Sequence, residues 1–361
     1  MTRSHRTHSL GPTTPFVRAA IDAARAVPGF GVDVEATLRW CVEVAQDTPP
    51  IATGRTTELW DLLAATAALD VAAGRMLEPH LDALSILQQA GAAQRADRDP
   101  LGVAAIRADA SSSWGVFAAE APGARLTARP DGDAWRLEGR KAWCSLAGFL
   151  SHALVTATLE DGRRGLFAVA LSDPTVTTHA GPWHPRGLTQ VVSAPVDFAG
   201  TAAVAVGDPE WYLQRPGFAW GGISVAAVWW GAALPFIDLL ASAAASERAD
   251  QLAFAHLGRA DAALWAARAA LREASALVDR AADPADAPDP RMLAARVRNI
   301  VAAAVTAVLT EADAALGPAP LVEADAYPRR VADLHLYLRQ HHGERDAARL
   351  GRLLAPTGEN S

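Results

Sequence analysis

The hydrophobic pattern of this chain changes period twice, and the two changes limit the folds that it can adopt. Over residues 16–91, apolar residues recur at three- and four-residue steps, as on one face of a helix. Over residues 102–207, alternating segments separated by Asp-Gly and Ser-Asp-Pro turns indicate strands. Helical periodicity returns over residues 217–354. This order predicts an α+β fold with segregated helical and β domains.

We place the domain boundaries where the hydrophobic period changes. Residues 1–15 are polar, lack the apolar stretch of a secretory signal and are predicted to be a disordered tail. An N-terminal helical domain is expected over residues 16–101, and a middle β domain, a barrel or sandwich, over residues 102–210. Residues 211–355 are expected to form a C-terminal four-helix bundle.

One apolar segment raises the question of a membrane. Ala219 to Ile237 carries no charge over 19 residues, which is near the length that spans a bilayer. Gly231 and Pro235 lie within it, and Asp238 follows at once. We therefore expect a helix buried within the bundle and no membrane span.

Charge and cysteine content narrow the function. The chain has 33 Lys and Arg against 40 Asp and Glu, a formal charge of -7, and no long basic block, so nucleic acid is not an expected partner. Cys41 and Cys144 are the two cysteines, which is too few for a disulfide framework or a thiolate zinc site. This composition fits the reducing cytoplasm, and no metal site is expected.

Two segments of the predicted β domain are informative together. Residues 114–120 read Trp-Gly-Val-Phe-Ala-Ala-Glu, and residues 139–145 read Gly-Arg-Lys-Ala-Trp-Cys-Ser. Taken alone, a tryptophan on a strand is most often part of the core. Together, the segments resemble two flavin-contacting strands in the middle domain of the acyl-CoA dehydrogenase family. The resemblance implies that Trp143 lies against the isoalloxazine ring of FAD and that the hydroxyl of Ser145 faces its N5 edge.

The resemblance covers residues 50–350 and carries further expectations. It implies that Phe117 and Ala119 contact FAD, although Ala119 stands where the family has threonine. It also implies that Arg248 is the nearest match to the arginine that holds the FAD pyrophosphate; the alternative is a solvated surface arginine. The implied substrate is a small molecule such as an acyl-CoA. The implied assembly is a homodimer or homotetramer, or a complex with a homologous partner subunit.

The position of the catalytic base departs from the family. Acyl-CoA dehydrogenases abstract a proton with a glutamate near the end of the last domain, and the corresponding position here falls on His341. His342 follows directly, and Glu344 could be a displaced base on the same terminal helix. A histidine can serve as a base because it titrates near neutrality.

Four functions stay open at this stage. The main one is an FAD-dependent dehydrogenase acting on an acyl thioester or a related compound, with His341 as the acid or base. The second is a flavin-dependent monooxygenase of the same fold, and the third is a catalytically inactive partner subunit whose histidines are solvated. The fourth rests on residues 341–346, which have the His-His-x-x-x-Asp form of an acyltransferase motif.

Overall fold

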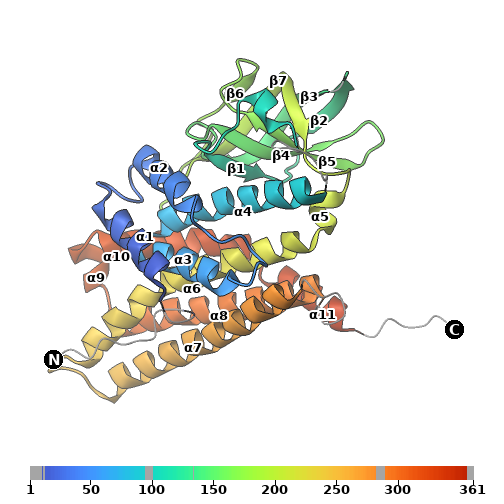
Figure 1. The fold of residues 1–361 in the computed structure, drawn as a ribbon. Coiled ribbons are helices and arrows are strands. Elements are labelled where there is room, and N and C mark those ends of the chain that lie inside the picture. Colours follow the sequence, from blue (N-terminus) through green and yellow to red (C-terminus); the bar gives the residue numbers. More distant parts are fainter. Residues whose placement is uncertain (1–9, 11–12, 94–100, 133, 282–288, 356–361) are drawn as a thin grey trace. The chain divides into compact units, whose positions relative to one another are not determined.

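The computed structural model describes residues 10, 13–93, 101–132, 134–281 and 289–355. Contacts divide the chain into two compact units. The helical unit comprises Met1–Asp22, Pro49–Gly74 and Ala219–Ser361, and the sheet unit comprises Ala23–Thr48 and Arg75–Phe218. The α+β class, with helical parts and a sheet part, is confirmed (Figure 1). The division into three domains stays a prediction.

Helices precede and follow the strands in the chain. The helices are α1 (Pro15–Ala26), α2 (Val34–Ala45), α3 (Thr56–Leu69), α4 (Val71–Ala93), α5 (Trp211–Gln214), α6 (Pro216–Ala244), α7 (Gln251–Arg280), α8 (Pro290–Leu316), α9 (Ala319–Glu323), α10 (Ala326–Tyr337) and α11 (Glu344–Leu354), with 3-10 turns η1 (Val103–Ile106) and η2 (Leu338–Gln340). The predicted tail lies mostly outside the described residues. Leu10, which is described, is fully buried, and its N–H donates to the carboxylate of Asp61.

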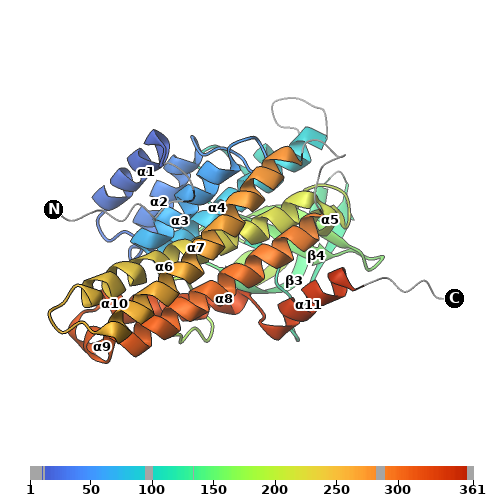
Figure 2. The same ribbon diagram turned by 90° about the horizontal axis from the view of Figure 1, so that it is seen from below.

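The helical unit is organised around α6, which runs beside α7 and α8 (Figure 2). Its apolar residues are buried on most sides, including Trp229, Trp230 and Phe236. Gly231 lies against α3: a Cβ added there would come within 2.1 Å of the backbone oxygen of Ala64. The glycines and Pro235 therefore do not interrupt the helix, and Gly231 allows two helices to pack backbone to backbone.

Two helices are long and apolar enough, by length and composition, to cross a membrane. They are α6 and α8, and the most apolar windows of these helices are 83% and 44% buried within the protein. Length and composition are weak grounds for a span, because core helices of soluble proteins pass the same test. The predicted burial of residues 219–237 agrees with the position of α6.

The sheet unit contains a barrel. Its strands are β1 (Trp114–Phe117), β2 (Leu126–Asp131), β3 (Ala134–Ser145), β4 (His152–Thr158), β5 (Arg164–Ala170), β6 (Val176–Thr178) and β7 (Ser193–Ala205). They follow the order β1-β4-β2-β3-β7-β5, and additional pairing of β4 with β5 closes the ring. β1 pairs in parallel with β4, whereas β3 pairs antiparallel with β2 and β7. The closed ring leaves few unpaired strand edges.

Candidate functional site

The two segments singled out from the sequence line one pocket in the sheet unit. The pocket is a shallow, partly open hollow, and the space among its lining residues is about 260 Å³ with open solvent included. β1 supplies its residues 114–117, and the end of β3 supplies Ser145. α4 and the loop after β3 complete the wall, whose full set is Arg75, Met76, Pro79, Trp114, Gly115, Val116, Phe117, Ser145, Leu146 and Leu150.

Trp143 occupies an irregular part of β3. Lys141 pairs with Val196 of β7, and Cys144 pairs with Ala194, so β3 carries one extra residue between the two pairs. This bulge bends the strand and redirects side chains. Trp143 adopts a left-handed backbone conformation with φ of 59°, and its side chain is 56% exposed. A bulky residue in this conformation costs free energy, and an exposed indole does not recover it by packing.

Ser145 belongs to a chain of hydrogen bonds. Nη2 of Arg75 donates to Oγ of Ser145 at 3.1 Å, and the Oγ atoms of Ser145 and Ser193 lie 2.7 Å apart. The Ser193 hydroxyl donates to the backbone oxygen of Val191 at 3.2 Å. Because Ser193 uses its hydrogen on Val191, the hydrogen of Ser145 points to Ser193. Neither Arg75 nor Ser193 was expected from the sequence.

An ion pair between a buried lysine and a half-exposed glutamate links the segment after β1 to β3. The side chain of Lys141 is only 2% exposed, and its Nζ lies 2.8 Å from Oε1 of Glu120 and 2.8 Å from Oγ1 of Thr156. Burial lowers the pKa of Lys141, and the nearby carboxylate of Glu120 opposes this shift. The pair fixes the backbone around Ala119, which is exposed, whereas Phe117 is buried.

The two partners of this ion pair should differ in their effect on stability. We expect Glu120→Ala to destabilise the sheet unit by about 2 kcal/mol, because it leaves a buried ammonium group with Thr156 alone. Lys141→Met should cost about 1 kcal/mol or less, because the Glu120 side chain is 44% exposed and can be hydrated. Urea unfolding of both variants, with Glu120→Gln as the control, measures the difference. Equal costs for the two truncations would contradict this asymmetry.

His80 is a further buried polar group of the sheet unit. The Trp114 N–H donates to its Nδ1 at 3.2 Å, so the proton of the neutral ring is on Nε2. Nε2 is buried and has no hydrogen-bond partner among the described residues. Burial lowers the pKa of His80 to about 4. A neutral histidine therefore ties α4 to the start of β1.

The structure corrects the expectation of one terminal helix carrying His341, His342 and Glu344. α10 ends at Tyr337, η2 follows, and His341 is extended. Gly343, with φ of 55°, precedes α11, which begins at Glu344. Here Asp346 accepts a hydrogen bond from the His342 N–H at 3.1 Å, as a capping residue does, and this contact explains the spacing of the acyltransferase-like motif.

His341 is held by hydrogen bonds within the helical unit. Its Nε2 lies 3.3 Å from Oδ1 of Asn299, and its Nδ1 accepts from the Gly343 N–H at 3.3 Å. Its ring meets the ring of Trp229 edge to face. Burial lowers the pKa of His341, opposed by the carboxylate of Asp346. His341 is therefore neutral near pH 7, with its proton on Nε2.

The other predicted residues of the helical unit are exposed. The His342 side chain is 64% exposed, and Glu344 is exposed in the first turn of α11. Arg248 is exposed in the turn between α6 and α7. The structure thus brings Phe117 and Ser145 to one pocket of the sheet unit and places Arg248, His341, His342 and Glu344 in the helical unit.

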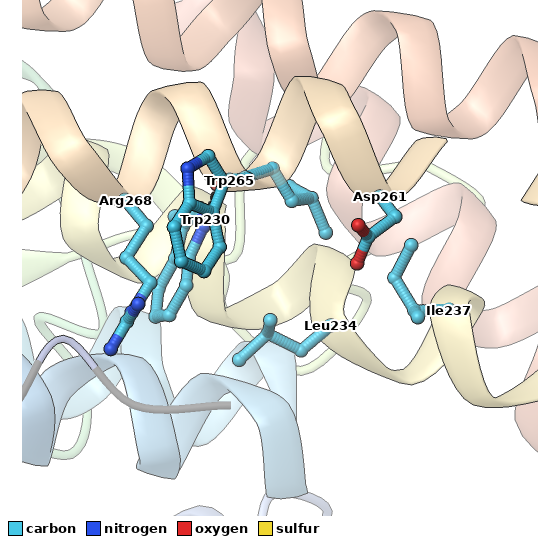
Figure 3. Close-up of a pocket in the computed structure, with 7 residues that line it drawn as sticks. Trp230, Leu234, Ile237, Asp261, Trp265 and Arg268 are labelled. Atoms are coloured by element: carbon cyan, nitrogen blue, oxygen red, sulfur yellow. Dashed lines mark hydrogen bonds between the residues drawn. The ribbon is translucent and has the colours of Figure 1, made fainter. Parts of the chain in front are cut away.

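A second pocket lies between α6 and α7 (Figure 3). It is lined by Trp230, Leu234 and Ile237 of α6 and by Asp261, Leu264, Trp265 and Arg268 of α7. Figure 3 shows Asp261 and Arg268 on opposite sides of the two indoles. The Arg268 guanidinium lies 5.4 Å from the ring centre of Trp265, and the Trp230 indole N–H donates to the Leu264 oxygen. These described lining residues include none of the residues predicted from the sequence.

Among known proteins, this chain is similar to several solved structures. The sequence matches no protein-family model and no curated protein. The nitrososynthase from Micromonospora carbonacea var. africana is 19% identical, with a TM-score of 0.79 over 97% of this chain and 99% of that one.

Two further solved structures are similar to this chain over nearly its whole length. Dibenzothiophene monooxygenase TdsC from Paenibacillus sp. A11-2 is 18% identical, with a TM-score of 0.75 over 96% of each chain, and it has also been solved with FMN bound. XiaF from Streptomyces sp., in complex with FADH2 and glycerol, is 16% identical, with a TM-score of 0.70 over 95% of this chain and 94% of that one. TdsC was thus solved with FMN and XiaF with FADH2. The chain therefore has the acyl-CoA dehydrogenase fold.

Proposed function

We propose that this protein is a flavin-dependent oxidoreductase whose flavin binds at the end of β3. The observation that carries the proposal is Trp143: a large indole is 56% exposed on a strained, bulged strand. Such a site fits a planar aromatic ring, because stacking on the indole would recover the cost of exposing it. Ser145, two residues later, supplies a hydroxyl at the adjoining pocket.

The residues of the site would hold the flavin in distinct ways. Trp143 would contact its ring, the Ser145 oxygen would accept a hydrogen bond, and buried Phe117 would exclude water from the pocket. The ion pair between Lys141 and Glu120 would keep the two segments in place. A bound flavin would supply two-electron chemistry and, when reduced, reaction with molecular oxygen. FAD is the form implied by the resemblance, while FMN is the form bound by TdsC.

Within this class, monooxygenase is the activity that we favour. The position of the dehydrogenase glutamate is taken by His341, a neutral imidazole that carries its proton on Nε2. Its Nδ1 accepts from the Gly343 N–H and its Nε2 faces Oδ1 of Asn299, so neither ring nitrogen is free to take a proton from carbon. Glu344 is exposed at the start of α11 and does not replace the missing base. Dehydrogenation of an acyl thioester is the second candidate, favoured by the fold.

The first test of the proposed flavin site replaces Trp143, whose backbone is strained, and measures flavin binding and stability. We expect Trp143→Gly to weaken flavin binding about tenfold, because the stacking surface is lost. The same substitution should stabilise the flavin-free protein by about 0.5–1 kcal/mol, because glycine adopts a positive φ without strain. Flavin fluorescence titration with FMN and FAD, paired with urea unfolding, measures both effects. Trp143→Phe, which keeps an aromatic ring, is the control. If Trp143→Gly lowers both the flavin affinity and the stability of the flavin-free protein, Trp143 has a structural role.

A second experiment separates the two activities. The flavin-loaded protein is mixed anaerobically with a set of acyl-CoAs, and absorbance is followed near 450 nm, where oxidised flavins absorb strongly. Bleaching would establish a dehydrogenase. For a monooxygenase we expect no bleaching, and we expect one ¹⁸O atom from ¹⁸O₂ in a product formed from reduced flavin and small aromatic substrates.

We also propose that the protein forms a homo-oligomer through the helical unit. Four large apolar side chains of α7 and α8 are exposed, namely Leu252, Phe254, Trp265 and Ile300. Exposed apolar side chains of this size favour burial at an interface. We expect light scattering to give a dimer or tetramer and Trp265→Glu to shift it to a smaller species with unchanged circular dichroism. A wild-type monomer would contradict this assembly.

A further inference from the structure

The chain between α10 and α11 is attached to the helices beside it by side chains of α8. Residues 338–343, the connecting segment, contain η2 and the turn before α11. Arg298 of α8 donates from Nη2 to the Gln340 oxygen at 3.0 Å and from Nη1 to the Gly222 oxygen at 2.7 Å. Its guanidinium also lies 4.8 Å from the ring centre of Trp229. Arg298 therefore joins the connecting segment to α6.

His341 is the second attachment of the connecting segment. Asn299 of α8 donates from Nδ2 to the Ala295 oxygen at 2.8 Å, so its amide oxygen faces Nε2 of His341, 3.3 Å away. Nε2 therefore carries the hydrogen, and the lone pair of Nδ1 accepts from the Gly343 N–H at 3.3 Å. Both ring nitrogens are engaged, each in the role that a neutral imidazole allows. A second proton could enter only at Nδ1, in the place of the Gly343 hydrogen.

The surroundings of His341 also favour the neutral ring. Burial is the largest cause of its lowered pKa. The carboxylate of Asp346 in α11 opposes this shift, but its Oδ2 lies 3.8 Å from Nε2, beyond hydrogen-bonding distance. α6 presents the uncharged ring of Trp229. Three basic groups lower the pKa further, namely Arg298, His342 and Arg339.

We propose that His341 is a proton-operated latch, which holds the connecting segment closed while its ring is neutral and releases the segment when Nδ1 takes up a proton. The added hydrogen displaces the Gly343 N–H, and the charged ring repels the guanidinium of Arg298, the other attachment. In the open segment the ring has the ordinary pKa of 6.5, so opening becomes more frequent as the pH falls below that value. The latch acts in the flavin-free chain as well, so it does not depend on the proposed function.

Hydrogen exchange of the full-length protein, followed by mass spectrometry, measures how often the connecting segment opens. Exchange rates are first corrected for the intrinsic chemical rate at each pH. We expect the opening equilibrium of peptides covering residues 338–346 to rise about tenfold from pH 7.5 to pH 5.5, because opening takes up one proton. Peptides of α7 report unfolding of the helical unit as a whole. No increase in residues 338–346, or an equal increase in α7, would overturn the latch.

The two adjacent histidines provide a matched pair of variants. His341→Asn keeps an oxygen that can accept from the Gly343 N–H but does not titrate, so its opening should change less than about twofold over the same range. His342→Asn removes a histidine whose side chain is 64% exposed, and it should behave as the wild type. The reverse result would assign the pH dependence to His342 and overturn the proposal.

Direct observation of the ring decides the question even if His341→Asn fails to hold the segment closed. ¹⁵N NMR of protein labelled in histidine distinguishes bare, hydrogen-bearing and charged ring nitrogens. We expect the His341 ring, identified by the signals missing from His341→Asn, to carry its hydrogen on Nε2 at pH 7.5 and to become charged only below pH 6.5. A charged ring, or a hydrogen on Nδ1, at pH 7.5 would overturn the latch.

Discussion

Gly231→Ala should destabilise the helical unit by about 3 kcal/mol or more, although alanine is the better helix former. The added Cβ would lie 2.1 Å from the backbone oxygen of Ala64 and 2.4 Å from its Cα. Both are backbone atoms of α3, so no side-chain rotation relieves the overlap. α3 and α6 would have to separate, and the packing of buried Trp60 with Ser224, joined by a 3.0 Å hydrogen bond, would loosen.

Gly258→Ala is the matched control for this substitution. Gly258 lies within α7, and a Cβ added there meets no heavy atom within 4 Å. The same chemical change should therefore stabilise the protein by up to about 1 kcal/mol through helix propensity. Urea unfolding monitored by circular dichroism measures both variants. Effects of the same sign at the two sites would contradict the close packing of α6 against α3.

His80 should make the sheet unit lose about 3 kcal/mol of stability as the pH falls from 7 to 4. The pKa of His80 is about 4 in the folded protein, against an ordinary value of 6.5. Below pH 6.5 the unfolded chain binds a proton that the folded protein excludes, so stability decreases as the pH decreases. The contribution is fully present above pH 6.5 and is lost as the pH falls to about 4.

His80→Asn isolates this effect. The asparagine oxygen can take the place of Nδ1 and accept from the Trp114 N–H, but it does not titrate. We expect the wild type to lose about 2 kcal/mol more than the variant between pH 7.5 and pH 5, a window above the range in which most carboxylates titrate. Urea unfolding at intervals of half a pH unit measures the two slopes. Parallel profiles would show that His80 becomes protonated without cost.

The sequence was sufficient to predict the order of helices and strands, and two of the residues it singled out, Phe117 and Ser145, line one pocket. The change of hydrophobic period predicted the strands between two helical regions, because side-chain alternation differs between strand and helix. The segment 139–145 identified Ser145, which lines the pocket with Phe117. These features depend on local pattern, which a sequence carries directly.

The rest of the pocket depends on tertiary packing. Arg75 lies 70 residues from Ser145 in the chain, and Ser193 lies 48 residues from it, so no local pattern joins them. The pairing of Lys141 with Glu120 likewise appears only when the segment after β1 packs against β3. Polar residues on amphipathic helices and strands look like solvated residues until the packing is known.

The break before α11 was missed for a different reason. The pattern through residues 338–346 predicts one helix, and Gly343 is the main local signal against it. In the structure the Asp346 carboxylate binds the His342 N–H, a local bond that competes with continued helix. The glycines of α6 did not mislead in this way: residues 219–237 were expected to form a buried helix, and close packing at Gly231 needs glycine within that helix.

The discontinuous make-up of the helical unit has a consequence for synthesis on the ribosome. Trp60 of α3 forms its hydrogen bond with Ser224 of α6, which lies 164 residues further along the chain. Residues 75–218 of the sheet unit are synthesised after α3 and before most of α6. Their strands can therefore pair while α3 has no α6 to pack against. During that interval the apolar face of α3 is open to solvent and to other nascent chains. We therefore expect chaperones that bind apolar segments to hold this stretch until α6 has been made.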